Sequence, residues 1–227
     1  METGEAMKLT PYLLRKIFSE KIIISLKRRY KIFFRISFSL NKMDKIIISN
    51  NYSTKGYYLE IGGNDGITQS NTYCLSRKGW SGLLVEPNHK NYKLCKYFRP
   101  NDKVVNSACV SFDEKKHYVY LSDNDLESSQ LHLTELDEVY IAPANTLNSI
   151  LIKQNAPKFI NFFSLDVEGA ELDVLKGLDF NNYSFGLILI EVRNDVNQVK
   201  ELLEKNGYKF REKFSHHDYL FEKSNYK

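Results

Sequence analysis

The sequence predicts an α/β fold in which a mostly parallel β-sheet is covered by helices on both faces. Three observations predict it. From residue 57 onward, short apolar runs alternate with stretches of helical periodicity, which is the pattern of βαβ units. Several runs are continuously apolar, such as FFSL and LILI, as expected for strands buried on both sides. The length of 227 residues and the hydrophobic content of 42% suit one such domain with an appendage.

The first part of the domain contains three expected strands and two expected helices. Glycine and proline mark their ends: Pro87 stops the second strand, and Gly79 lies just beyond the first helix, which Ser70 or Asn71 caps. We expect strands at residues 57–63, 81–87 and 103–111, and helices at residues 70–79 and 89–98.

The second part begins with polar, irregular residues 111–145, which contain one possible strand at residues 117–121. Within this part, residues 122–144 are long enough to form a lid over a substrate. Regular alternation then resumes, and the chain ends in the pattern of a β-hairpin at residues 208–223. We expect helices at residues 145–154, 169–178 and 196–207, and strands at residues 160–167 and 185–192.

We expect residues 1–50 to form a basic helical arm and residues 51–227 to form the domain. Residues 1–45 contain 11 Lys and Arg against 4 Asp and Glu, so they carry +7 and the remaining chain carries −3 of the net charge of +4. Charges interrupt the apolar residues of the arm, which indicates an amphipathic helix and not a membrane-spanning one. Such a helix contacts an anionic membrane surface, or packs against its own domain or a second subunit.

The three cysteines, Cys74, Cys95 and Cys109, have neither CxxC spacing nor an even count. This pattern argues against a disulfide framework or a zinc site and for a reducing compartment. We therefore expect a cytoplasmic protein, peripheral to a membrane if the arm binds lipid, with the three thiols as apolar filling of the core.

The strongest functional signal is the segment LEIGGNDGITQSNT at residues 59–72, between the first strand and its helix. Gly62 and Gly66 allow a tight turn and a close approach to a ligand, at the edge where α/β sheets bind cofactors. The spacing fits neither the dinucleotide pattern GxGxxG nor the Walker pattern. Glu60 and Asp65 make the loop acidic, which disfavours a pyrophosphate and favours a cation, such as a sulfonium with an ammonium group.

Glu86 is the second signal, at the end of the strand SGLLVEP. An acid at this place in an α/β sheet accepts hydrogen bonds from the two hydroxyls of a ribose. Together with the glycine-rich loop, Glu86 predicts a site for a ligand that contains a nucleoside.

Three further acids close strands at the same edge of the sheet. Asp166 and Glu168 follow FFSL, and Glu191 follows LILI. Crowded carboxylates are unfavourable unless a cation, a metal ion or a proton shares them. They are therefore candidates for a catalytic base and, as hard oxygen ligands, for binding Mg²⁺. Arg193 pairs with one of these acids or binds an anionic substrate.

These motifs resemble the FkbM family of methyltransferases. The resemblance covers residues 57–192 and is carried by LEIGGNDGITQSNT, GWSGLLVEPN, NTLNSIL and FSLDVEGAELDVLKGLDF. It implies a Rossmann-like class I methyltransferase with a seven-stranded sheet and S-adenosylmethionine as the methyl donor. It also implies O-methylation of a hydroxyl on a sugar, a glycan or a small natural product.

On this resemblance, the glycine-rich loop surrounds the methionine part of the cofactor and Glu86 binds its ribose. We also expect contributions from Thr68, later in the loop, and from Ser107, in the third strand. The expected cofactor-binding residues are Glu60, Gly62, Asn64, Asp65, Gly66, Thr68, Glu86, Ser107 and Asp166.

The resemblance places Asp166 and Glu168 near the methyl-transfer point, and Glu191 completes the set of expected catalytic residues. A hydroxyl that attacks a methyl group must lose its proton, so we expect Asp166 or Glu168 to act as the base. The base acts directly or through a Mg²⁺ held by Asp166, Glu168 and Glu191, which lowers the pKa of the hydroxyl.

Two other classes of function stay open. One is a non-catalytic, membrane-associated module on the same fold, with the arm as its lipid contact. The other is a nucleic-acid methyltransferase with the arm as a basic anchor, although the sequence lacks the N/D-P-P-Y motif of amino-methylating enzymes. We expect a small-molecule or glycan acceptor, no nucleic acid, and a membrane contact or a homodimer through residues 1–45.

Overall fold

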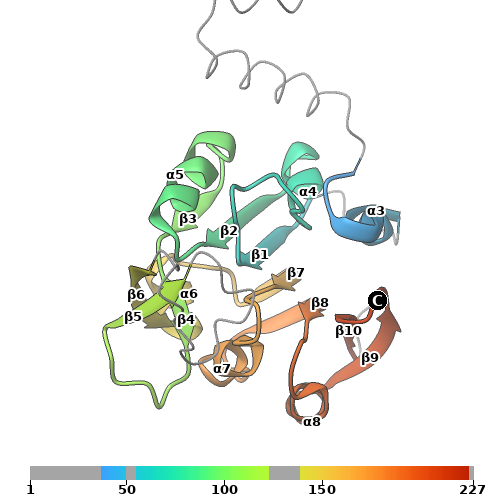
Figure 1. Ribbon diagram of the computed structural model, residues 1–227. Helices are drawn as coiled ribbons and strands as arrows, with labels where there is room; N and C mark the ends of the chain where they lie inside the picture. The colour runs from blue at the N-terminus through green and yellow to red at the C-terminus, as the bar shows by residue number, and fades with distance from the viewer. Residues whose placement is uncertain (1–36, 50–54, 123–138, 225–227) are drawn as a thin grey trace, which may run out of the picture. The chain divides into compact units, whose positions relative to one another are not determined.

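The computed structural model of the chain describes residues 37–49, 55–122 and 139–224. Its centre is a seven-stranded sheet in the order β3-β2-β1-β7-β8-β10-β9 (Figure 1). Neighbouring strands pair in parallel except at β10, which is antiparallel to β8 and β9, so the expected sheet and C-terminal hairpin are confirmed. The strands are β1 (Tyr57–Ile61), β2 (Ser81–Val85), β3 (Lys103–Val105), β7 (Phe159–Leu165), β8 (Ser184–Glu191), β9 (Tyr208–Lys213) and β10 (Asp218–Lys223).

Helices cover both faces of this sheet, as the sequence predicts (Figure 1). Each face has its own hydrophobic core, because successive side chains of a strand point to opposite faces. Leu84 of β2 belongs to the core beneath α3, α4 and α5, whereas Leu83 and Val85 belong to the core beneath α6, α7 and α8. The helices are α3 (Met43–Ser49), α4 (Tyr73–Arg77), α5 (His89–Phe98), α6 (Leu147–Lys153), α7 (Glu171–Lys176) and α8 (Val196–Lys205).

The third expected strand, at residues 103–111, is in fact two strands in different sheets, so this prediction was wrong. The chain turns away at Asn106, whose amide donates to the carbonyl oxygens of Glu86 and Pro87. Beyond it, a three-stranded sheet forms in the order β4-β6-β5. Its strands are β4 (Ala108–Val110), β5 (Tyr118–Ser122) and β6 (Val139–Thr146), of which the sequence analysis missed β6.

Residues 37–49 pack into the domain, although the sequence analysis assigns them to the arm. Phe38, Met43 and Ile47 are almost fully buried, and the last two share a core with Tyr58 of β1. The Asp44 carboxylate accepts a hydrogen bond of 2.7 Å from the Phe38 N–H, which fixes the entry to α3. The compact unit that contains the domain accordingly runs from Ser37 to Lys227.

The first 36 residues of the expected arm lie outside the described residues, as does most of the expected lid at residues 122–144. Among the described helices, none combines the length and the apolar content that crossing a bilayer requires.

Candidate functional site

The glycine-rich loop leaves β1 at the carboxyl edge of the sheet and runs against the end of β7. Gly62 has a φ of 85°, in the left-handed region that favours glycine. A Cβ atom at this position would lie 1.8 Å from the main-chain oxygen of Asp166. The loop and the acid that follows β7, which are far apart in the sequence, therefore meet at one point.

Glu86 follows β2 and joins two loops at the same edge. Its carboxylate accepts hydrogen bonds from the N–H groups of Asn64, at 2.7 Å, and Asn88, at 2.8 Å. A carboxylate at this edge of the sheet, with about four acceptor positions, is the type of group that binds the hydroxyls of a ribose. The geometry fits the expected role of Glu86, which stays a prediction.

Glu60 lies beneath the loop and supports it. The residue is 4% exposed, and its carboxylate accepts hydrogen bonds from the hydroxyls of Ser70, at 2.9 Å, and Thr72, at 2.6 Å. Burial raises the pKa of Glu60, and the nearby positive charge of Arg99 opposes that rise. These contacts fix the segment that follows the loop, and direct contact of Glu60 with the cofactor stays a prediction.

Asp65 and Thr68 bond to each other within the loop. The Asp65 carboxylate accepts hydrogen bonds from the N–H of Thr68, at 2.7 Å, and from its hydroxyl, at 2.8 Å. Ser107 is fully buried, and its hydroxyl donates to the carbonyl oxygen of Pro143 in β6 at 3.0 Å. These polar groups have structural partners, and their expected contacts with the cofactor stay predictions.

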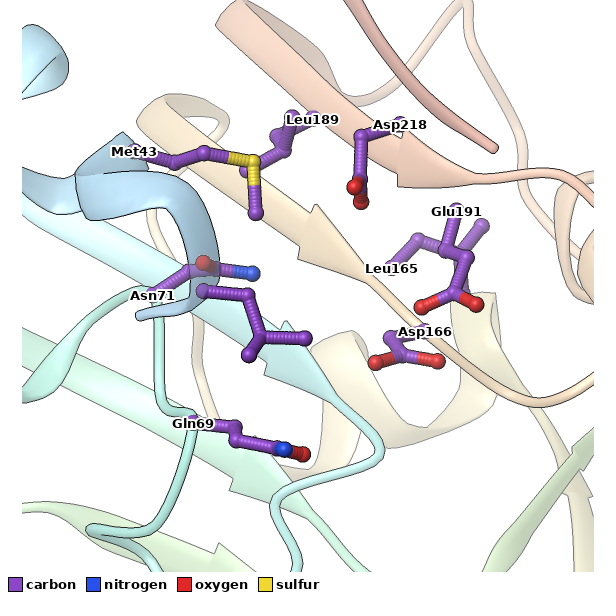
Figure 2. A pocket seen from close by; sticks show the side chains of 9 residues that line it. Met43, Gln69, Asn71, Leu165, Asp166, Leu189, Glu191 and Asp218 are labelled. Carbon is purple, nitrogen blue, oxygen red and sulfur yellow. The ribbon is translucent and has the colours of Figure 1, made fainter. Parts of the chain in front are cut away.

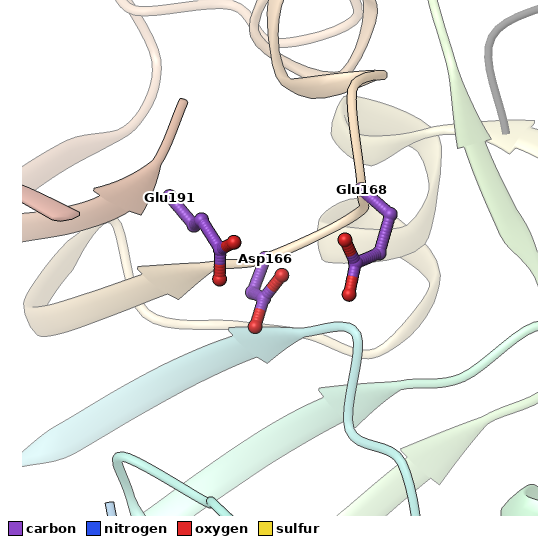
Figure 3. Close-up of side chains that lie close together, drawn as sticks. All are labelled: Asp166, Glu168 and Glu191. Carbon is purple, nitrogen blue, oxygen red and sulfur yellow. The ribbon is translucent and has the colours of Figure 1, made fainter. Parts of the chain in front are cut away.

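Three acids gather at the carboxyl ends of β7 and β8, where Asp166 lies between Glu191 and Glu168 (Figure 3). One oxygen from each carboxylate lies within 4.8 Å of one from each of the other two. Burial, and then the charges of Glu191 and Glu168, raise the pKa of Asp166 to about 8. Its Oδ1 atom is buried and has no hydrogen-bond partner among the described residues. The carboxyl group of Asp166 is therefore harder to ionise than an ordinary Asp side chain and, once ionised, a stronger base.

Arg193 follows β8 and forms ion pairs with two of these acids. Its guanidinium contacts the carboxylate of Glu168 and, at 3.1 Å, that of Glu191. Glu168 has a φ of 56°, an uncommon conformation for a residue with a side chain. Strain of this kind often occurs at functional sites, where the surrounding contacts hold it.

A family model for the methyltransferase FkbM domain matches residues 60–210, about two thirds of the 227 residues. The chain belongs to the FkbM methyltransferase family. As an FkbM protein with this sheet, it is an S-adenosylmethionine-dependent methyltransferase, as the resemblance predicts. No curated protein matches the chain.

Several solved structures resemble the FkbM chain. A TehB-like SAM-dependent methyltransferase from Corynebacterium glutamicum has 11% identity and a TM-score of 0.46, over 90% of this chain and 97% of that one. A methyltransferase from Geobacter sulfurreducens has 8% identity and a TM-score of 0.46, over 93% and 92% of the two chains. A ribosomal protein L11 methylase from Lactobacillus delbrueckii has 8% identity and a TM-score of 0.45, over 81% and 78%.

The FkbM domain has a small hollow beside the acid cluster, of about 10 Å³, on the order of one water molecule. Asp166, Glu191 and Asp218 lie along one side of it, and Met43 and Asn71 along the other (Figure 2). The carboxyl oxygens of these acids and the amide oxygen of Asn71 accept hydrogen bonds. The hollow therefore fits a small group that donates hydrogen bonds, such as a hydroxyl.

The sequence did not predict three polar residues of this hollow: Gln69, Asn71 and Asp218. Asn71 is 9% exposed, and its Oδ1 atom has no hydrogen-bond partner among the described residues. Asp218 is 8% exposed and is paired with Glu191 in the register of β10 and β8. The signal for Asp218 was available, because an acid directly before the apolar run YLF at the start of a strand is unusual. The signal for Asn71 was not, because asparagine in a loop is common.

Proposed function

We propose that this protein methylates a hydroxyl of a sugar, a glycan or a small natural product, with Asp166 as the general base. One observation carries the proposal: Asp166 is half-buried with a buried Oδ1 atom, has a pKa raised to about 8, and lies beside the glycine-rich loop. An ordinary carboxylate is a weak base, and this environment makes Asp166 a stronger one. A hydroxyl acceptor requires such a base, because its oxygen must lose a proton as it attacks.

The residues around Asp166 have separate tasks in this proposal. S-adenosylmethionine supplies an electrophilic methyl group on a positively charged sulfur. The glycine-rich loop and Glu86 hold the cofactor, and orientation of the two reactants accounts for much of the acceleration. The ionised form of Asp166, whose share increases as the pH rises toward its pKa of about 8, takes the proton of the acceptor hydroxyl. Glu191 and Glu168 keep Asp166 basic through their charges, and Arg193 limits the total negative charge of the cluster.

A divalent cation is the alternative to direct proton transfer. Asp166, Glu168 and Glu191 present oxygen atoms of the kind that Mg²⁺ prefers. However, Arg193 already pairs with Glu168 and Glu191, so a bound ion would compete with its guanidinium for the same oxygen atoms. We therefore favour Asp166 as a base that acts without a metal ion.

Replacement of Asp166 by asparagine tests the proposal. Asn has the shape of Asp but cannot accept the proton, so we expect Asp166→Asn to lower the methylation rate by about 10²- to 10⁴-fold. The dissociation constant for S-adenosylhomocysteine, measured by calorimetry, should change little. The rate is measured with an acceptor found by screening sugar and natural-product hydroxyls, and Asp113→Asn, at an exposed Asp, is the matched control.

Three results would contradict this proposal in different ways. Full activity of Asp166→Asn would exclude Asp166 as the base. Loss of wild-type activity in EDTA, restored by Mg²⁺, would assign the cluster to a metal ion instead. Folded wild-type protein that binds neither S-adenosylmethionine nor S-adenosylhomocysteine would support the non-catalytic module.

A further inference from the structure

Helix α5 holds the glycine-rich loop from the side opposite the acid cluster. Two side chains donate hydrogen bonds to main-chain oxygens of the loop, each at 2.9 Å: Cys95 Sγ of α5 to Asn64, and Nη1 of Arg99, the C-cap residue of α5, to Gly66. A Cβ atom at Gly66 would lie 3.0 Å from Cγ of Arg99 and 3.2 Å from Cα of Cys95. The loop therefore lies directly on this end of α5.

Arg99 makes the more extensive set of contacts. Its Nη2 donates to the hydroxyls of Tyr58 and Thr72, each at 2.9 Å, and its Nε donates to the carboxylate of Asp102 at 2.6 Å. Glu60 adds an ion pair at 3.8 Å. The guanidinium thus joins β1, the glycine-rich loop and the segment that follows the loop. A planar group with five donors is suited to this, whereas a lysine ammonium is not.

Arg99 is only 1% exposed, although it carries a full charge. Removing such a charge from water is costly, and buried ion pairs are often no more stabilising than apolar residues of the same size. Their better-supported role is to select one geometry among alternatives. Arg99 selects the geometry of the loop at Gly66. Two residues earlier in this loop, the N–H of Asn64 donates to the carboxylate of Glu86.

We propose that Arg99 is a positioning residue for S-adenosylmethionine, which sets the conformation of the glycine-rich loop without touching the cofactor. The inference rests on cofactor binding by that loop. Arg99→Lys keeps the charge but cannot form all of the bonds to Gly66, Tyr58, Thr72 and Asp102. Because each bond from a charged donor contributes substantially, we expect its affinity for S-adenosylhomocysteine to fall by about tenfold to a hundredfold.

The control separates positioning from general stability. Leu203 of α8 is fully buried in the core on the other face of the sheet. Leu203→Ala should lower the melting temperature but leave the affinity for S-adenosylhomocysteine within twofold of wild type. Hydrogen exchange gives a second measurement: amides of residues 62–72 should exchange faster in Arg99→Lys than in Leu203→Ala.

Wild-type affinity of folded Arg99→Lys would overturn the inference. The inference would also be overturned if Leu203→Ala lost as much affinity for S-adenosylhomocysteine as Arg99→Lys while the two variants had the same melting temperature. If Arg99→Lys does not fold, Tyr58→Phe takes its place, because this variant removes one acceptor of Arg99 and keeps the aromatic ring. A severalfold loss of affinity for S-adenosylhomocysteine in Tyr58→Phe would support the inference, and an unchanged affinity would refute it. Failure of the wild type to bind would instead contradict cofactor binding itself.

Discussion

A carboxyl group that is buried among other carboxyl groups keeps its proton to higher pH than one in water. Asp166 is in this situation, because it lies beside Glu168 and Glu191 and its Oδ1 atom has no partner among the described residues. The arrangement reduces the stability of the protein, since an ionised Asp166 is unfavourable in the folded state. The same arrangement makes Asp166 a suitable base, so at this residue stability and function oppose each other.

Asp166 should make the folded protein less stable as the pH rises. An unfolded Asp has a pKa of about 3.9, whereas the pKa of Asp166 in the folded state is about 8. Between these values the folded state binds the additional proton, so the free energy of unfolding falls as the pH rises. Asp166→Asn removes this dependence. From about pH 5 to about pH 8, the melting temperature of Asp166→Asn should fall less than that of wild type. Each kcal/mol of stability that wild type loses relative to Asp166→Asn corresponds to a difference of roughly 2–4 °C.

The measurement is thermal unfolding of both proteins across this range, and it needs no acceptor substrate. Parallel curves for wild type and Asp166→Asn would show that the pKa of Asp166 is not raised. The exposed Asp113→Asn should follow wild type at every pH.

At the scale of elements, the loop after β1 has little room for change. It is bounded by the end of β7 at Gly62 and by α5 at Gly66. The carboxylate of Glu86, after β2, adds a third contact through the N–H of Asn64. Three elements therefore determine one short segment, and its conformation depends on all of them.

Replacement of Gly62 by alanine tests this constraint. Gly79 is a matched control, because its φ of 86° is close to the 85° of Gly62, but a Cβ atom there would have nothing within 4 Å. Gly79→Ala should lose about 1–2 kcal/mol of stability from the backbone conformation alone and bind S-adenosylhomocysteine normally. Gly62→Ala must also move the loop away from Asp166, so we expect a larger loss of stability and at least a tenfold loss of affinity.

Denaturant unfolding and calorimetry measure the two effects. Equal affinities of Gly62→Ala and Gly79→Ala for S-adenosylhomocysteine would show that the contact between the loop and β7 is unimportant for the cofactor.

For the whole molecule, the charge is divided unevenly between the N-terminal segment and the domain. The compact unit with the domain runs from Ser37 and includes α3, whose Met43 also lines the hollow beside the acids. Residues 1–36, before this unit, contain 9 Lys and Arg against 3 Asp and Glu. We propose that they bind an anionic membrane surface, because basic residues interspersed with apolar ones suit such a surface.

Deletion of residues 1–36 tests this proposal. The full chain should sediment with vesicles that contain phosphatidylserine and should be released by high salt, whereas the chain from Ser37 should stay in solution. Neutral vesicles are the control. Equal sedimentation of both proteins would contradict a lipid role for the segment, and loss of a dimer on deletion would assign the segment to subunit contact.

Local patterns in the sequence were sufficient to predict most of the main sheet and the residues at its carboxyl edge. A buried parallel strand must be apolar along its length, so the runs FFSL and LILI predict two such strands. The chain must turn where it leaves a strand, so the glycine-rich segment predicts the loop after the first strand. The expected helix at residues 89–98 has the bounds of α5. The acids Asp166, Glu168 and Glu191 follow strands of one sheet and were expected together for this reason.

Only the tertiary structure decided how these residues are used. The break between β3 and β4 depends on the bonds of Asn106 to the loop after β2, which no local pattern records. Asn71 and Asp218 join the hollow because separate segments fold back to it, and Arg99 reaches Gly66 because α5 packs on the loop. Sequence patterns report whether a side chain is buried or exposed, but contacts between distant segments, and the pKa values that follow from them, exist only in the folded chain.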